Sequence, residues 1–140
     1  MSFQFTRKLT IEWGHCDPAG IVFNPRFFEF FDWSTALLLQ AALGMAKSDL
    51  FAAYGIVGVP LVETRANFLA PLRFGDEAEI VSCVTAIGRS SFEIDHKLFN
   101  AAQLAVDGHE KRVWTSRDAE TGRLKSKALP EDVARKLNGG

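Results

Sequence analysis

Residues 26–43 carry apolar side chains on every side of the helix that they would form, and this feature constrains the fold most. At about 100° per residue, the twelve apolar side chains of this segment surround the helix axis. Gly44 is a suitable left-handed residue to end such a helix, which would be about 28 Å long. A helix of this kind needs burial on nearly every side, and a sheet that curves around it provides that burial.

Five other segments have the composition and the alternation of β-strands. They cover residues 3–11, 61–72, 77–87, 91–100 and 103–117. Short turns between the last four predict an antiparallel meander, with a candidate bulge at Gly108. We therefore expect an α+β fold in which one five-stranded antiparallel sheet wraps around one long central helix. One helix cannot cover every apolar strand face, so we also expect a homo-oligomer that joins two sheets edge to edge.

The remaining segments complete one expected domain over residues 1–140. Residues 45–54 predict a short helix or a loop that ends at Gly55, residues 118–122 predict a turn, and residues 130–137 predict a small closing helix. A length of 140 residues suits one domain with a substantial core.

Composition and charge argue against several classes of protein. Hydrophobic residues make up 47% of the chain and charged residues 24%, which is typical of a folded globular protein. A net charge of −1 provides no general field for nucleic acid or an anionic membrane. The apolar runs are far shorter than the roughly 20 residues of a membrane span, and residues 1–8 lack a signal-peptide core. We expect a cytoplasmic protein that binds neither nucleic acid nor membrane.

The long helix follows a loop that contains a carboxylate. Asn24 is a favoured N-cap residue, and Pro25 suits the first helical position. The unpaired N–H groups and the positive end of the helix dipole would then face residues 14–23, which include Asp17. Because an oxyanion is stabilised at such a helix end, we expect chemistry there. The plainer alternative is that Asp17 caps a turn, since Asp-Pro is a frequent turn dipeptide.

The neighbours of Asp17 suggest two other chemistries. The spacing of His15 and Asp17 resembles that of metal ligands, but no further ligand cluster stands nearby in the sequence. Cys16 and His15 form a poor nucleophile and base, because adjacent side chains of an extended loop point in opposite directions. Cys16 and Cys83 lack a CxxC spacing, so we expect two free thiols. We expect no metal and no cofactor.

Three motifs are similar to those of one known family. They are DPAGIV at residues 17–22, the helix start at Asn24 and Pro25, and GIVGVP at residues 55–60. The chain resembles the hotdog-fold acyl-CoA thioesterases, in particular the 4-hydroxybenzoyl-CoA thioesterase subgroup, most strongly over residues 11–32 and 55–74. The resemblance implies hydrolysis of an acyl-CoA thioester without a cofactor. It also implies a dimer with sites at its interface, and a tetramer of two such dimers.

The resemblance also assigns roles to residues. It implies that Asp17 acts either as a nucleophile or as a general base on water, and that the backbone N–H of Asn24 binds the oxyanion. The 4-hydroxybenzoyl enzyme has an aromatic residue where Asn24 stands, which leaves the acyl group open, either aromatic or short to medium aliphatic. The expected substrate-binding residues are Gly20 in the loop, Val57, Gly58, Val59 and Pro60 in the acyl pocket of the partner subunit, and Arg89, Ser90 and Ser91 at the CoA phosphates.

Alternatives remain for residues and for function. Glu29 and Asp32 lie three residues apart on the helix with Arg26, as a structural polar stripe or, as in a second group of hotdog thioesterases, as auxiliary or replacement catalysts. His96 is expected to be a core histidine with satisfied hydrogen bonds, and His109 is expected at the surface. The alternative functions are a hotdog dehydratase of 3-hydroxyacyl thioesters and a non-catalytic acyl-CoA-binding protein.

Overall fold

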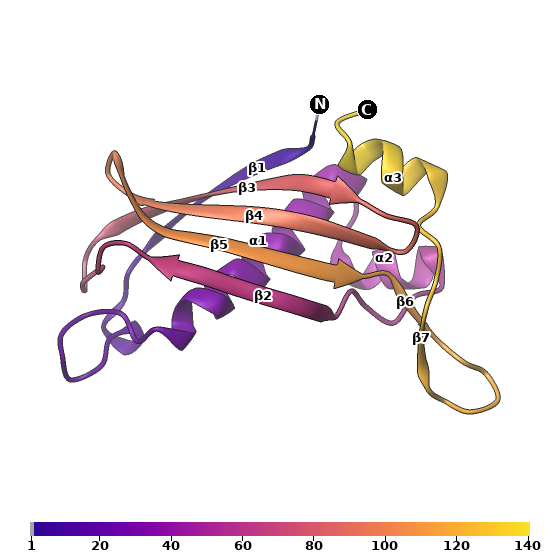
Figure 1. The fold of residues 1–140 in the computed structure, drawn as a ribbon, viewed down its shortest axis with the longest axis horizontal. Helices are drawn as coiled ribbons and strands as arrows, with labels where there is room; N and C mark the ends of the chain where they lie inside the picture. Colours follow the sequence, from indigo (N-terminus) through magenta and orange to yellow (C-terminus); the bar gives the residue numbers. More distant parts are fainter. Residues whose placement is uncertain (1) are drawn as a thin grey trace.

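A five-stranded antiparallel sheet curves around one long helix in the computed structural model, which describes residues 2–140 (Figure 1). The strands are β1 (Gln4–Thr10), β2 (Leu61–Phe68), β3 (Glu77–Ile87), β4 (Ser91–Asn100) and β5 (Gln103–Val113). Their order across the sheet is β1-β3-β4-β5-β2. The predicted α+β arrangement is confirmed.

The long helix is α1 (Pro25–Leu43), which lies across the inner face of the sheet (Figure 1). It ends as predicted at Gly44, whose φ is +70° and whose N–H donates to the Gln40 carbonyl at 2.9 Å. The prediction of burial on nearly every side is wrong for one face, where Trp33 is 62% exposed. The sheet covers only one side of the helix, so the other side meets solvent in a single chain.

Two hydrophobic clusters fill the space between α1 and the sheet. In the first, Leu38 and Leu39 from the second half of α1 pack with Trp114. In the second, Phe27 and Phe31 from the first half pack on the far end of the sheet. Each fully buried side chain of this size stabilises the fold by about 1.5–3 kcal/mol, so these clusters fix the helix on the sheet.

The predicted meander of four strands is wrong for β2, which pairs with β5 and not with β3. β1 pairs with β3 along its whole length and occupies the edge that a β2–β3 hairpin would need. Residues 69–76 instead cross the end of the sheet. The N–H of Ile11 donates to the Asp76 carbonyl at 2.8 Å, and the N–H of Val22 donates to the Leu72 carbonyl at 2.9 Å. The crossing is therefore attached to the loop that precedes α1.

Gly108 is not a bulge, contrary to the prediction. It stays in regular register opposite Ala66 and His96, and the irregularity of the β4–β5 pair lies near Leu98. A Cβ atom on Gly108 would lie 2.5 Å from the ring of Phe31. The glycine is required here because Phe31 approaches the strand backbone closely.

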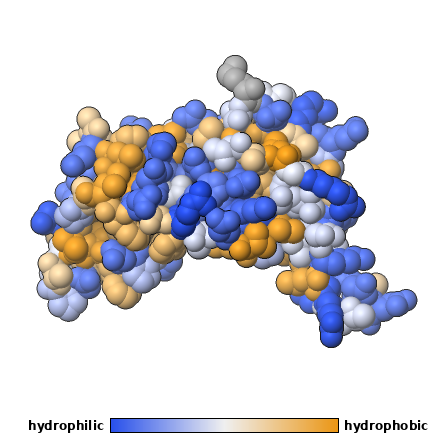
Figure 2. All heavy atoms as spheres, in the orientation of Figure 1, coloured by the Kyte–Doolittle hydropathy of each residue, from blue (hydrophilic) through white to orange (hydrophobic). Residues whose placement is uncertain are grey.

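Strand β2 forms one edge of the sheet, and nearly all of its side chains are exposed. Val62, which lies at a register irregularity of the β2–β5 pair, is 58% exposed, and Leu61 and Phe68 are exposed as well. Figure 2 shows hydrophobic surface near the start of β2 and around its far end. The edge therefore combines apolar side chains with backbone groups that face no neighbouring strand.

The C-terminal half adds three smaller features. The segment after α1 forms α2 (Lys47–Tyr54), which settles the choice between helix and loop. The last predicted strand divides at Trp114 into β5 and β6 (Thr115–Arg117), and β6 pairs with β7 (Leu124–Ser126) across the predicted turn. The chain closes with α3 (Glu131–Leu137). Among residues 2–140, no single helix has the length and hydropathy to cross a membrane. Only α1 and α2 taken together have that length and hydropathy, and they are separated by a bend of 63°.

Candidate active site

A narrow hairpin-like loop between β1 and α1 carries Asp17. The N–H of Asp17 donates to the Ile21 carbonyl at 3.1 Å, and the N–H of Phe23 donates to the His15 carbonyl at 2.9 Å. Gly20 lies at the tip of the loop with a φ of +83°, a backbone conformation that residues other than glycine rarely adopt. The loop is thus a defined structure, and it fixes the direction of Asp17.

The half-buried carboxylate of Asp17 has one oxygen fixed and one unengaged. Oδ1 accepts the Ala19 N–H at 2.8 Å, so Asp17 does cap the turn. Within residues 2–140, Oδ2 has no hydrogen-bond partner. Asp17 and Gly20 line a hollow of about 360 Å³ beside Trp13 and Phe74. An oxygen that is oriented through its partner oxygen and open to a cavity can attack a carbonyl or accept a proton.

Asn24 does not cap α1 with its side chain, contrary to the prediction. Its own φ and ψ are helical, at −49° and −42°, and the N–H groups that a cap would serve are already bonded. Arg26 donates to the Phe23 carbonyl at 2.8 Å, and Phe27 donates to the Asn24 carbonyl at 3.1 Å. The backbone N–H of Asn24 has no recorded partner within residues 2–140. Asn24 lines a second cavity, of about 310 Å³, with Phe27 and Phe68.

The expected acyl-pocket segment lies at the opposite end of the sheet. Residues 57–60 precede β2, whereas the Asn24 cavity adjoins Phe68 at its end, and the eight residues of β2 span about 25 Å. Val57, Gly58, Val59 and Pro60 line a separate hollow of about 360 Å³. Arg89, Ser90 and Ser91 are at the same end, where the Ser90 carbonyl accepts the Trp114 N–H at 2.7 Å. One chain therefore does not bring the predicted residues together.

His15 and Cys16 have structural contacts. His15 Nδ1 accepts the Glu12 N–H at 2.9 Å, and its ring meets Phe30 edge to face at 4.9 Å. Cys16 Sγ lies 3.9 Å from the Glu12 carbonyl oxygen. Both Cys16 and Cys83 are free thiols, as predicted. In the part of the chain that the structure describes, no group of three or more His, Cys, Asp or Glu side chains is arranged to hold a metal ion.

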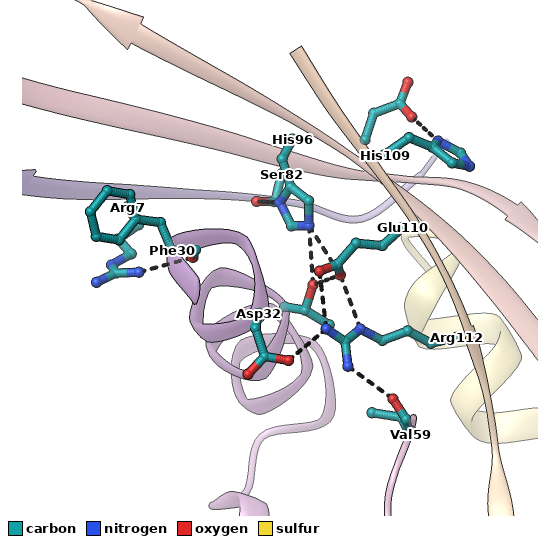
Figure 3. A network of polar contacts seen from close by, with 11 residues as sticks. Arg7, Phe30, Asp32, Val59, Ser82, His96, His109, Glu110 and Arg112 are labelled. Atoms are coloured by element: carbon teal, nitrogen blue, oxygen red, sulfur yellow. Dashed lines mark hydrogen bonds and ion pairs between the residues drawn. The ribbon is translucent and has the colours of Figure 1, made fainter. Parts of the chain in front are cut away.

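Sequence reasoning missed a buried polar network between α1 and the sheet (Figure 3). Arg112 binds Glu110 through two nitrogens, Nε and Nη2, each at 3.0 Å, and its Nη2 also binds Asp32 at 2.7 Å. His96 continues the network, because its Nε2 lies 3.2 Å from Glu110 and its Nδ1 lies 2.7 Å from Ser82 Oγ. Glu110 is 1% exposed. The only sequence signal was a pair of charged residues at positions of β5 that face inward.

The network favours the charged forms of Glu110 and Arg112. Burial alone would raise the pKa of Glu110, but hydrogen bonds from His96 and Arg112 outweigh it and lower the pKa to about 2. Burial would likewise lower the pKa of Arg112, whereas Glu110 and Asp32 raise it. His96 is a core histidine with satisfied hydrogen bonds, as predicted.

The predicted polar stripe on α1 divides into two pairs. Arg26 binds Glu29 at 3.0 Å in an exposed pair, while Asp32 binds Arg112. Asp32 is still 61% exposed, because its second oxygen faces away from the network. The structure therefore gives Asp32 a structural partner and leaves Glu29 on the surface.

His109 lies on the outer face of the sheet, as predicted, but it is partly buried there. Its side chain is 13% exposed and lies between Asp95 and Glu93, which come from the neighbouring strand β4. Burial would lower the pKa of His109, but the hydrogen bonds to Asp95 and Glu93 outweigh that effect and raise it. Its partners are far away in sequence, and only strand pairing brings them close.

The chain is similar to known proteins over nearly its whole length. The sequence profile of the thioesterase-like superfamily matches residues 11–137. The 4-hydroxybenzoyl-CoA thioesterase of Pseudomonas sp. strain CBS-3 is 30% identical over 138 residues, which cover 94% of this chain and 96% of that protein. The 1,4-dihydroxy-2-naphthoyl-CoA hydrolase of Synechococcus elongatus is 31% identical over 96 residues, 69% of this chain and 68% of that protein.

A solved structure shows the same similarity in three dimensions. It is the crystal structure of an Asp-to-Asn mutant of 4-hydroxybenzoyl-CoA thioesterase, complexed with 4-hydroxybenzoyl-CoA. It superimposes with a TM-score of 0.87 at 27% sequence identity, over 97% of this chain and 99% of that chain. The hotdog fold that the motifs suggested is therefore confirmed.

Proposed function

This chain belongs to the thioesterase-like superfamily and is an acyl-CoA thioester hydrolase, and on that premise we propose that Asp17 carries out the hydrolysis of an aromatic acyl-CoA. The single observation that carries the role of Asp17 is its carboxylate, which is fixed through Oδ1 while the residue itself lines a cavity. The aromatic acyl group rests on the relatives, whose names specify 4-hydroxybenzoyl-CoA and 1,4-dihydroxy-2-naphthoyl-CoA.

Asp17 has two routes to the same products. As a nucleophile, its oxygen bonds to the acyl carbon, the C–S bond breaks, CoA leaves as the thiolate, and water then hydrolyses the resulting anhydride. As a general base, Asp17 takes a proton from the water that attacks the acyl carbon, the C–S bond then breaks, and CoA leaves as the thiol with that proton. In either route the thioester oxygen becomes negative. The free N–H of Asn24 and the positive end of the α1 dipole are suited to stabilise that charge.

Each site needs residues from two copies of the chain. We expect two copies to pair through the exposed, apolar β2 edge, about a two-fold axis. Antiparallel pairing places the start of one β2 beside the end of the other. Residues 57–60 of one copy then approach Asn24 and Asp17 of its partner, which removes the separation of about 25 Å along β2. A tetramer would join two such dimers.

The CoA part of the substrate would meet the same partner. Arg89, Ser90 and Ser91 lie at the end of the sheet that also carries residues 57–60. Pairing through β2 therefore brings both segments to the same site, where Arg89 is suited to bind a phosphate. We keep the cytoplasm as the proposed location, on the grounds of composition alone.

The test is release of free thiol from a panel of aromatic, arylacetyl and aliphatic acyl-CoAs. Asp17→Asn should lower kcat by about a thousandfold or more and leave the fold and oligomer unchanged. Asp49→Asn, an exposed substitution of the same type on α2, is the matched control and should behave as the wild type. Normal turnover by Asp17→Asn would remove Asp17 from the mechanism, and Asp32→Asn tests the rival carboxylate directly. A wild-type protein that releases thiol from none of the panel would overturn the proposed hydrolysis.

A further inference from the structure

Three consecutive carbonyl groups before β2 all accept hydrogen bonds, but the middle one is bonded by a side chain. The Gly58 carbonyl accepts the Thr115 N–H at 3.2 Å, and the Pro60 carbonyl accepts the Val113 N–H at 3.1 Å. The Val59 carbonyl between them accepts from Arg112 Nη1 at 2.9 Å. Val59 is buried, so without Arg112 its carbonyl would lose the side-chain hydrogen bond that satisfies it.

Arg112 is held by more bonds than an anchor of one carbonyl needs. Its Nε and Nη2 bind Glu110, its Nη2 also binds Asp32, and its Nη1 binds Val59. A guanidinium group presents these donors in one plane, so fixing two sides of it also fixes the third. The position of the Val59 carbonyl is therefore tied to a carboxylate of the sheet and to a carboxylate of α1.

The network behind Arg112 has no freedom to move independently of the core. Thr35 of α1 donates to Glu110 at 2.5 Å, and His96 and Ser82 complete the chain of contacts into β4 and β3. All of these side chains lie between the two hydrophobic clusters of the core. The same helix α1 begins at the Asn24 site. The network therefore fixes the position of residues 58–60 relative to α1, the helix that begins at the proposed oxyanion site.

We propose that Arg112 is a positioning residue that sets the place of residues 58–60 and thereby the acyl groups that the pocket accepts. Arg112 also lines the hollow of about 360 Å³ that these residues form, so a shift of its guanidinium would change the pocket wall itself. The inference rests on the proposed function, in which residues 58–60 contact the acyl group in the partner's site.

Stability alone is a poor explanation for this arrangement. A buried ion pair often contributes no more than well-packed apolar residues of similar volume, because the charges lose their hydration. The Arg112–Glu110 pair would be satisfied without a contact to the loop. The hydrogen bond from Arg112 to the Val59 carbonyl is not needed by the ion pair, and it fixes the distance between the core and residues 58–60.

The first arm of the test does not depend on activity. Amide hydrogen exchange is measured for residues 56–61 in the wild type, Arg112→Lys, Asp32→Asn and the exposed control Arg135→Lys. Lysine keeps the charge but cannot serve Val59, Glu110 and Asp32 together, so Arg112→Lys should speed exchange in this segment by about tenfold or more. Asp32→Asn should have a smaller effect, and Arg135→Lys none. Unchanged exchange over β1 shows that the rest of the fold is intact.

The second arm separates positioning from a general loss of folded protein. kcat/KM is measured for benzoyl-CoA and for the shortest aliphatic acyl-CoA that the wild type hydrolyses. Arg112→Lys should lower kcat/KM for benzoyl-CoA by about tenfold or more and for the short substrate by less than about threefold, because only the large acyl group reaches the loop. A purely structural role would lower both values by the same factor.

The outcomes separate this inference from the proposed function. Equal losses for both substrates, or unchanged exchange in residues 56–61, would overturn the role of Arg112 while hydrolysis by the wild type stands. A wild type that hydrolyses no acyl-CoA would overturn the proposed function. The exchange arm would still decide whether Arg112 anchors the segment, since faster exchange in Arg112→Lys supports the anchor and unchanged exchange contradicts it.

Discussion

The ring of Phe31 lies flat on the imidazole of His96, with the ring centroids 4.9 Å apart and an angle of 5° between the planes. The stack joins α1 to β4 at the point where the second hydrophobic cluster of the core meets the polar network. Directly opposite His96 in the sheet is Gly108, which leaves room for the ring of Phe31. A small residue, an aromatic ring and a buried imidazole therefore act together to set the distance between the helix and the sheet.

Replacing Gly108 by alanine should destabilise the fold through this stack. The added Cβ would lie 2.5 Å from Phe31, and a buried ring has no open space into which to move. The free energy of unfolding should fall by about 1–3 kcal/mol, measured by urea denaturation. Gly14→Ala is the matched control, because its Cβ would meet nothing within 4 Å. Equal stability of Gly108→Ala and the wild type would mean that Phe31 can repack freely.

The ionised state of Glu110 predicts how stability depends on pH. Its pKa falls from the ordinary value of 4.5 to about 2 in the folded protein, so its contribution to stability is fully present above pH 4.5 and is lost as the pH falls toward 2. Glu110→Gln should lower the free energy of unfolding by about 3 kcal/mol at pH 7, because Arg112 then lacks its buried counter-charge.

Glu110→Gln should lower the free energy of unfolding only slightly at acid pH. Urea unfolding of the wild type and Glu110→Gln at pH 7, 4 and 2.5 should show a gap in the free energy of unfolding that is largest at pH 7 and narrows once the pH falls below about 4.5. Glu131→Gln, an exposed substitution of the same type on α3, should track the wild type throughout. A gap that stays constant across this range would show that Glu110 is not the group that titrates.

Local patterns predicted the elements of the fold better than their pairing. The structure confirms the two strands and the helix that local patterns predicted at residues 77–87, 91–100 and 26–43. These patterns, alternation in the strands and apolar side chains all around the helix, are properties of neighbouring residues. The place of β2 beside β5 depends on β1 taking the free edge of β3. This pairing joins residues that are far apart in sequence, so a periodic pattern within one segment does not predict it.

The candidate site shows the same division. His96 was recognisable as a core residue because its own strand neighbours are apolar, whereas Glu110 and Arg112 break the apolar pattern of the inner face and were missed. Their partners Asp32 and Val59 come from other elements. The carboxylate partners of His109, Asp95 and Glu93, were missed for a related reason, because they come from the next strand. The roles of Asp17 and Asn24 stay predictions until they are tested by substitution.

At the helix start, the backbone and the side chain of Asn24 can be tested separately. The side chain makes no cap bond, so Asn24→Ala should change the free energy of unfolding by less than about 0.5 kcal/mol and leave kcat nearly unchanged. Asn24→Pro removes the N–H at a φ of −49°, which proline accepts, so it should lower kcat by about a hundredfold without a large loss of stability. A normal kcat in Asn24→Pro would exclude this N–H as the oxyanion donor.

Sites shared between two copies of the chain predict that two inactive variants restore activity when mixed. Asp17→Asn damages the carboxylate of one copy, and Val57→Arg places a charged side chain in the acyl pocket that the other copy would contribute. After unfolding and refolding together in equal amounts, half of the dimers contain both variants, and each has one of its two sites intact, which gives about a quarter of the wild-type rate. The measurement is thiol release by the mixture and by each variant alone. Activity that stays at the sum of the two separate variants would mean that each site is built within one chain.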